Sequence, residues 1–193
     1  GDSAPLIYCC LDMGYVTHAM RSGVVAWLQE KLGDEFDESR FVLTCTHTHS
    51  GPGGCAHEGL YNLVTPGFVP EHLDAVVAAC GSALGEAIET RAATEIRYHQ
   101  RVLAENIPVA WNRSLKAYNR NPDVTRYNPD QTHLALDRTM HLISFHRQGQ
   151  VEAMLSLFGV HATCLGSSLS NYDGDNKGYA SLHAESCLRA EGV

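Results

Sequence analysis

Two histidines separated by a single residue, His47 and His49, are the side chains in this sequence best suited to chemistry. They belong to residues 46–54 (THTHSGPGG), which follow a short apolar run. If extended backbone continues through the pair, residues two apart point to the same side, and both imidazoles face one ligand. Such a pair binds a metal ion, or divides metal binding and proton transfer between its rings. Taken alone the pair favours an ordinary structural role, but the glycine-rich flank, which permits close approach of backbone to a ligand, favours a site.

Two more residues become candidates in combination with this pair. His161 follows the apolar run MLSLFGV and is expected to close a strand. A lone histidine there is more often a hydrogen-bonded core residue, but together with the pair it offers a third imidazole, a nitrogen ligand that suits zinc. Arg113 carries a planar guanidinium that can hold a carbonyl or an oxyanion, although a solvated loop charge is the simpler interpretation of this residue alone.

A further polar segment, residues 173–179 (DGDNKGY), combines turn-forming residues with charges. It could bind a metal, or lock a loop through hydrogen bonds from its Asp and Asn side chains. An EF-hand loop needs a late glutamate that is missing here, so the structural role is favoured unless the loop approaches the histidines. His57 could line the site of the histidine pair, but surface exposure is favoured for it. The remaining histidines are weaker candidates: His18, His72, His99, His133, His141, His146 and His183.

The residues around these candidates predict alternating strands and helices. An apolar run at 6–11 indicates a buried strand, and apolar residues at helical spacing cover 15–32, with Gly33 as the stop. A second buried strand is predicted at 41–45. A strand, a helix and a strand within about 35 residues favour a parallel strand pair. The histidine pair therefore follows the end of a strand, which is where such sheets place their chemistry.

The rest of the chain extends this pattern. A second helix is predicted from Pro70, whose residue type suits the first helical position, to about residue 88. Residues 112–130 are dense in Asn, Asp, Arg, Pro and Tyr and predict a long functional loop. The other predicted elements are strands at 95–102, 139–145 and 151–160, a hairpin turn at 147–150, a polar loop at 166–178 and a helix at 179–190. Together they indicate an α/β fold with a mixed, partly parallel sheet, flanking helices and a site in loops at strand ends.

Composition narrows the class of protein. The 193 residues carry 14 Lys and Arg against 22 Asp and Glu, a net charge of −8, and 44% of them are hydrophobic. These values predict a single globular domain over residues 1–193 and disfavour nucleic acid as a partner, because no excess of positive charge is available for phosphates. No apolar run is long enough for a transmembrane segment, and no signal peptide is visible. The seven cysteines lack metal-binding spacing and are expected to be mostly buried, reduced thiols.

Four short motifs occur in the order known from one enzyme family. Residues 46–54 (THTHSGPGG) resemble the signature of neutral/alkaline non-lysosomal ceramidases. Residues 112–122 resemble that family's N-R-S-P-x-A-Y…N-P segment, residues 160–163 (VHAT) its F-x-V-H-G-T segment, and residues 174–180 (GDNKGYA) its S-G-D-N-K-G-Y-A segment. Each motif is short, but together they are specific, and the resemblance covers most of the chain.

The resemblance implies a zinc-dependent amidohydrolase that splits the N-acyl amide bond of ceramide, a lipid substrate, into sphingosine and a fatty acid. It implies that His47 and His161 are ligands of the Zn²⁺ cofactor. His49 and Arg113 are implied as catalytic residues near the scissile amide. There His49 would assist proton transfer, and Arg113 would hold the amide or its developing oxyanion.

The chain also departs from the family pattern. Family members run to several hundred residues, and the resemblance places their remaining zinc ligands, a Glu and a Tyr, and their catalytic serine beyond residue 193. The chain is therefore expected to be a portion of a larger catalytic domain, with apolar surface left for further chain or for a homo-oligomer to cover. Leu115 replaces the family's proline, Ala162 its glycine and Asp173 its serine.

These departures leave two alternatives to ceramide hydrolysis open. One is a metal-dependent hydrolase that acts on another amide or ester on the same scaffold. The other is an inactive partial domain, because two histidines alone bind zinc weakly. The residues do not decide the compartment, and members of the resembled family are often secreted or membrane-associated.

Overall fold

The computed structural model describes residues 5–166 and 168–190, which combine helices with one parallel and one antiparallel sheet. The predicted α/β class with mixed strand pairing is confirmed. Of the described residues, those up to position 92 and those between 162 and 187 form one compact unit, and residues 93–161 and 188–190 form another. A single domain over residues 1–193 stays a prediction. Within the described part of the chain, no helix is long and apolar enough to cross a membrane.

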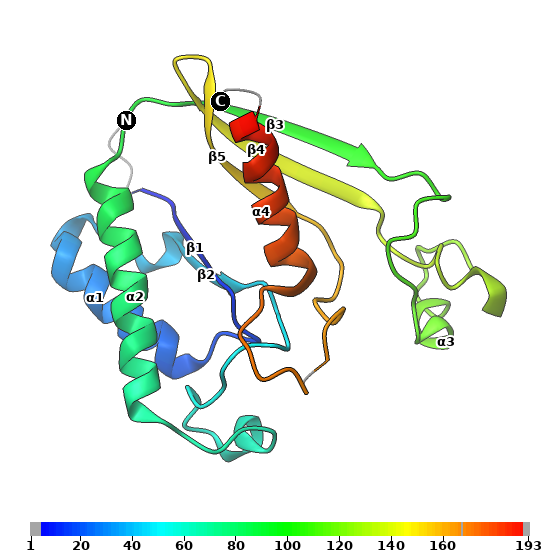
Figure 1. The fold of residues 1–193 in the computed structure, drawn as a ribbon, viewed down its shortest axis with the longest axis horizontal. Coiled ribbons are helices and arrows are strands. Elements are labelled where there is room, and N and C mark those ends of the chain that lie inside the picture. Colours follow the sequence, from blue (N-terminus) through cyan, green and yellow to red (C-terminus); the bar gives the residue numbers. More distant parts are fainter. Residues whose placement is uncertain (1–4, 167, 191–193) are drawn as a thin grey trace. The chain divides into compact units, whose positions relative to one another are not determined.

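The first unit is built on a parallel strand pair and two long helices (Figure 1). Both predicted strands are confirmed, whereas the first helix begins at His18 rather than at residue 15. The reason is the Thr17 hydroxyl, which accepts a hydrogen bond from the Met20 N–H and so caps the helix. The elements of this part of the chain are β1 (Ile7–Leu11), α1 (His18–Leu32), β2 (Phe41–Cys45) and α2 (Pro70–Glu89), with short 3-10 turns η1 (Gly33–Glu35), η2 (Glu38–Arg40) and η3 (Gly59–Asn62).

The core of this unit lies between the two helices and the strand pair. A Cβ added at Gly81 would lie 2.8 Å from Nε1 of Trp27, and one added at Gly23 would lie 2.6 Å from Cγ2 of Val77. These glycines therefore set how closely α1 and α2 approach each other. The buried side chains of the main cluster are Val24, Val25, Leu28, Phe41, Cys80 and Leu84.

Leu28 gives the clearest test of this core. Its side chain is 0% exposed, so Leu28→Ala should leave a cavity and lower the free energy of unfolding by about 2–5 kcal/mol. Leu60, which is 73% exposed in η3, is the matched control, and Leu60→Ala should change that free energy by less than about 0.5 kcal/mol. Urea denaturation followed by circular dichroism measures both. Equal losses for the two variants would contradict this description of the core.

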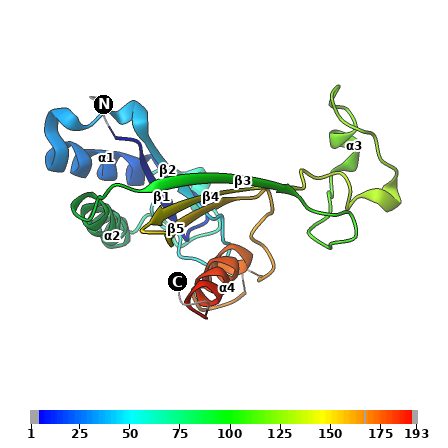
Figure 2. The ribbon, with the colours of Figure 1, turned by 90° about the horizontal axis from the view of Figure 1, so that it is seen from above.

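The second unit contains a three-stranded antiparallel sheet in the order β3-β4-β5 (Figure 2). Its strands are β3 (Glu95–Val102), β4 (Thr139–Arg147) and β5 (Gln150–Leu157). The predicted hairpin turn is confirmed: Arg147 pairs with Gln150, and Gln148 and Gly149 between them have φ values of 53° and 86°. Positive φ at both central residues is typical of a type I′ turn, whose twist matches that of the strands.

The end of β5 corrects one prediction. The strand ends at Leu157 and not at residue 160, so His161 does not close it. The backbone leaves the ladder directly after the strand, where the Phe158 carbonyl accepts a hydrogen bond from the Val160 N–H at 2.9 Å. His161 is therefore a loop residue.

Residues 112–130 are more ordered than the predicted loop. They contain a one-turn helix, α3 (Leu115–Tyr118), and the start of the turn η4 (Pro129–Gln131). The Asn119 side chain donates to the Tyr127 carbonyl at 2.9 Å and accepts from the Tyr127 N–H at 3.1 Å. The asparagine-rich composition thus serves backbone hydrogen bonding. Leu115 is the first residue of α3, a position where the family's proline also fits.

The last helix and the cysteines also differ from expectation. α4 (Asp175–Ala190) begins four residues before the predicted position, 179, because an Asx turn at Asp173 starts it.

All seven cysteines are free thiols, but only Cys55 and Cys80 are buried, so the prediction of mostly buried thiols is wrong. The alternation of β1 turns Cys10 outward, and Cys164 and Cys187 lie on an exposed loop and an exposed helix surface.

Candidate metal centre

The backbone at the histidine pair is not extended. β2 ends at Cys45, and His47 has a φ of 64°, in the left-handed region that few non-glycine residues adopt. Neighbouring backbone holds it there, because the His47 N–H donates to the Met13 carbonyl at 3.1 Å. The geometric reason for the predicted convergence of the two rings is therefore wrong. Backbone strain of this kind persists where surrounding structure enforces it, and it is common at functional sites.

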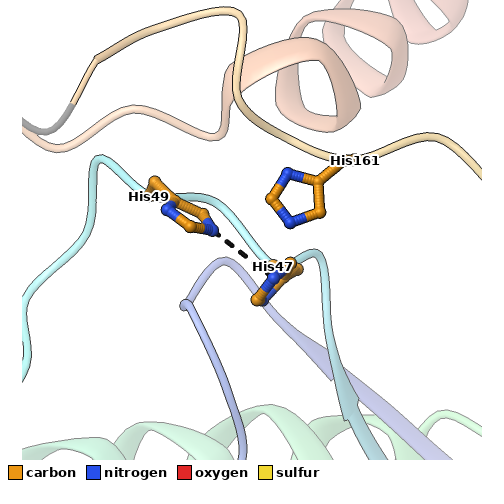
Figure 3. Close-up of side chains that lie close together, drawn as sticks. All are labelled: His47, His49 and His161. Carbon is orange, nitrogen blue, oxygen red and sulfur yellow. Dashed lines mark hydrogen bonds between the residues drawn. The ribbon is translucent and has the colours of Figure 1, made fainter. Parts of the chain in front are cut away.

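The rings of His47 and His49 nevertheless converge, in an edge-to-face arrangement with centroids 4.8 Å apart (Figure 3). Nδ1 of His47 hydrogen-bonds the Gly14 carbonyl, so Nδ1 carries the proton and Nε2 keeps its lone pair. Nε2 of His47 lies 3.4 Å from Nε2 of His49. A carbonyl that fixes the tautomer of a ring in this way is the usual partner of a metal-binding histidine.

His161 joins this pair. It directly precedes Ala162, which is fully buried. Ala162 is the first residue of the second stretch of chain, residues 162–187, that belongs to the first unit. His47, His49 and His161 each offer a ring nitrogen, and these nitrogens lie within 4.8 Å of one another (Figure 3). The three predicted histidines are thus brought together.

The donor set fits a zinc ion. Two nitrogens bound to one tetrahedral zinc at about 2.0–2.1 Å stand roughly 3.3–3.4 Å apart. The 3.4 Å between the Nε2 atoms of His47 and His49 agrees with that spacing. All three histidines are exposed, which leaves room for further ligands and for a substrate. The geometry accommodates His49 either as a ligand or as a proton-transfer group next to the ligands.

Residues 173–175 approach the histidines, which is the arrangement that the sequence allowed but did not predict. The Thr48 hydroxyl, between the two histidines in the chain, donates to the Asp173 carbonyl at 2.6 Å. The Asp175 carboxylate accepts hydrogen bonds from the N–H groups of Cys164 and Leu165, shortly after His161. The prediction that hydrogen bonds to Asp side chains lock this loop is therefore confirmed. The sequence predicted no individual role for Thr48 or Asp175, because both roles depend on contacts with distant segments.

The pKa of Asp175 provides a test of these bonds. Burial acts to raise it, but the N–H groups of Leu165, Asn176 and Cys164 outweigh burial and hold the pKa below its ordinary value. A depressed pKa adds stability above the unfolded-state value of about 4, and this contribution disappears as the pH falls through the folded-state value. Asp175→Asn should therefore be less stable than the wild type at pH 6, and the gap should narrow as the pH falls below about 4. Thermal unfolding across this range measures the gap, and a gap independent of pH would contradict the prediction.

Arg113 belongs to the second unit, and its surroundings are defined there. It is exposed and lines a surface hollow of about 530 Å³ together with Trp111, Lys116 and Arg120. Its neighbour Asn112 is firmly anchored: the side-chain amide donates to the Ala135 carbonyl at 3.0 Å, and the backbone N–H donates to the Thr132 carbonyl at 2.9 Å. Asn112 therefore fixes the backbone from which the guanidinium extends.

Two of the other histidines have contacts away from this cluster. His57 is exposed, as favoured from the sequence, and its ring contacts that of Phe68 at a tilt of 39° with centroids 4.2 Å apart. His146 is buried on β4 with Nε2 at 2.9 Å from the Ser144 hydroxyl. Among the described residues, the only group of three or more His, Cys, Asp or Glu side chains suited to a metal is the histidine cluster.

Comparison with known proteins identifies the family. Residues 2–192 match the family described as neutral/alkaline non-lysosomal ceramidase, N-terminal. The chain belongs to this family. It is 33% identical to the neutral ceramidase of Pseudomonas aeruginosa over 181 residues, which cover 93% of this chain and 26% of that protein. It is 31% identical to the neutral ceramidase of Mycobacterium tuberculosis over 84% of this chain and 24% of that one.

A solved ceramidase structure has the same fold. The crystal structure of the Pseudomonas aeruginosa neutral ceramidase superposes with a TM-score of 0.84 at 32% identity, over 94% of this chain and 28% of that one. The resemblance stated from four motifs is thus confirmed across nearly the whole chain. The chain spans about a quarter of the length of the ceramidases it matches.

Proposed function

We propose that this chain supplies the histidine centre of a zinc-dependent amidohydrolase that cleaves the N-acyl amide bond of ceramide. Water adds to the acyl carbon and the C–N bond breaks, which yields a fatty acid and sphingosine. The observation that carries the proposal is the convergence of three histidine nitrogens within 4.8 Å in a member of the ceramidase family.

The residues divide the work by their chemistry. His47 and His161 hold the zinc, and the carbonyl of Gly14 orients the ring of His47. When bound, zinc supplies a Lewis acid for the amide carbonyl and lowers the pKa of water. His49 accepts a proton from the attacking water and returns one to the leaving nitrogen. Arg113 holds the amide oxygen as it becomes negative.

The proposed substrate is a lipid, and it differs from smaller amides in the groups attached to the amide bond. Leu115 and Ala162 replace family residues in two of the motifs, so a different amide or ester on the same scaffold is the second candidate. Ala162 favours this alternative more than Leu115 does, because it is fully buried next to His161. The acyl chain and the sphingoid base are the parts of ceramide that a short amide lacks.

The test is hydrolysis by the intact protein. Sphingosine and fatty acid released from N-acylsphingosines are measured by mass spectrometry, with short N-acyl amides and esters as the comparison. Activity on ceramide should exceed that on the short substrates, disappear with a zinc chelator and return when zinc is added. Preference for short substrates would support the second candidate. Hydrolysis that is unaffected by chelation, or no hydrolysis of any substrate by zinc-loaded protein, would overturn the proposal.

A further inference from the structure

One short segment, residues 173–175, contacts both loops that carry the candidate metal ligands. On one side, the Asp173 carbonyl accepts from the Thr48 hydroxyl at 2.6 Å, and the Asp173 N–H donates to the Ser50 carbonyl at 2.9 Å. On the other side, the Asp175 carboxylate accepts from the N–H groups of Cys164 at 3.0 Å and Leu165 at 2.8 Å. The segment therefore links the loop of His47 and His49 to the loop that follows His161.

Thr48 provides the side chain for the contact with Asp173. Its side chain is 1% exposed and lies between two exposed histidines in the chain. Its hydroxyl donates to Asp173 and accepts from the Ser50 N–H at 3.2 Å, so both of its hydrogen-bonding capacities are used. His47 and His49, on either side of it in the chain, are both exposed. The backbone between the two histidines is thus tied to the carbonyl of Asp173.

Asp175 makes the second contact. It is 3% exposed and has a φ of 55°, a left-handed conformation that Asp and Asn tolerate better than most residues. Its own N–H donates to the Asp173 carboxylate at 2.7 Å, which fixes the turn. Because its carboxylate is occupied by backbone N–H groups, Asp175 organises the loop and does not serve as a metal ligand.

Glycine is needed next to this contact. A Cβ added at Gly174 would lie 2.7 Å from the Cα of Gly178, in the first turn of α4. Backbone atoms cannot move aside as a side chain does, so a larger residue at position 174 would displace the segment from the helix. The backbone of the first turn of α4 thus packs closely against Gly174 and helps to hold residues 173–175 in place.

We propose that residues 173–175 act as a clasp, a segment that fixes the two histidine loops relative to each other. Asp175 and Thr48 are its positioning residues for the metal centre. The inference rests on the proposed function, because it concerns the affinity of the same site for zinc. Side chains that orient metal ligands without touching the metal affect its binding strongly, and their loss costs about 10- to 100-fold in affinity.

The first test is Asp175→Asn in the intact protein. Asparagine keeps the tolerance for left-handed backbone but loses a charge and places an N–H₂ group where an acceptor is needed. Zinc affinity, measured by competition with a chromophoric chelator, should fall about 10- to 100-fold. The matched control is Asp37→Asn, since Asp37 also accepts backbone and hydroxyl hydrogen bonds, from Ser39, but belongs to the exposed cap of η2. Its affinity for zinc should equal that of the wild type.

The second test separates positioning from loss of folding. Thr48→Val keeps the volume and removes the hydroxyl, whereas Thr48→Ser keeps the hydroxyl. Thr48→Val should weaken zinc binding by about 10-fold or more and shift the visible spectrum of the cobalt-substituted protein, and Thr48→Ser should restore both. If Asp175→Asn does not fold, this pair still decides the question.

The outcomes distinguish the clasp from the function on which it rests. A wild-type protein that binds no zinc would overturn the proposed function. Wild-type zinc affinity and cobalt spectrum in both Asp175→Asn and Thr48→Val would overturn the clasp and leave the proposed function standing. Loss of affinity in Asp37→Asn equal to that in Asp175→Asn would also overturn the clasp, because the effect would then be general.

Discussion

His47→Ala should abolish zinc binding and reduce ceramide hydrolysis by roughly 10³-fold or more. A metal that acts as a Lewis acid contributes several kcal/mol to transition-state stabilisation, and each ~1.4 kcal/mol is a factor of ten in rate. His47 is the proposed ligand whose tautomer is set by the Gly14 carbonyl and whose backbone is held at a φ of 64°. Metal content by elemental analysis and sphingosine release measure the two losses together.

The control for this substitution is His57→Ala. His57 lies ten positions further along the chain, is exposed, and contacts Phe68 rather than the histidine group. Its replacement should leave zinc content and hydrolysis within about twofold of the wild type, as expected for a surface change that costs less than ~0.5 kcal/mol. Full zinc content in His47→Ala would contradict the assignment of His47 as a ligand. Equal losses in the two variants would attribute the effect to the loop as a whole.

The parallel strand pair of the first unit was predictable from local pattern. The apolar runs at residues 6–11 and 41–45, with a helical period between them, leave a right-handed crossover as the main option. Glycine at position 33 and proline at position 70 marked the end of α1 and the start of α2 correctly. These features depend on residues near one another in the chain, which is why the sequence carries them.

The geometry of the candidate metal centre was only partly predictable. The residue types identified His47, His49 and His161, but the pair converges through left-handed backbone at His47 rather than through an extended strand. That conformation is enforced by the Met13 carbonyl from another segment, and no local pattern encodes it. Asp175 likewise looks like an ordinary turn residue until its carboxylate meets two N–H groups ten and eleven positions away.

Arg113→Ala should lower kcat for ceramide about 10²- to 10³-fold while zinc content stays at the wild-type value. The expected size is that of removing one donor to a developing oxyanion. Because this interaction strengthens as negative charge develops, the loss should fall on kcat more than on KM. Arg113→Lys should recover little, since a lysine ammonium lacks the planar fork that holds a carbonyl oxygen in a fixed geometry.

Arg120→Ala is the matched control, because Arg120 is also exposed and lines the same surface hollow as Arg113. It should leave kcat, KM and zinc content nearly unchanged. The pattern across variants separates the roles: loss of His47 removes metal and activity together, whereas loss of Arg113 removes activity from a metal-loaded protein. Unchanged values of both kcat and KM in Arg113→Ala would instead assign Arg113 to the solvated surface, the simpler interpretation that its sequence context allows. A rise in KM with an unchanged kcat would make it a binding residue, because the interaction would then be equal in the ground state and the transition state.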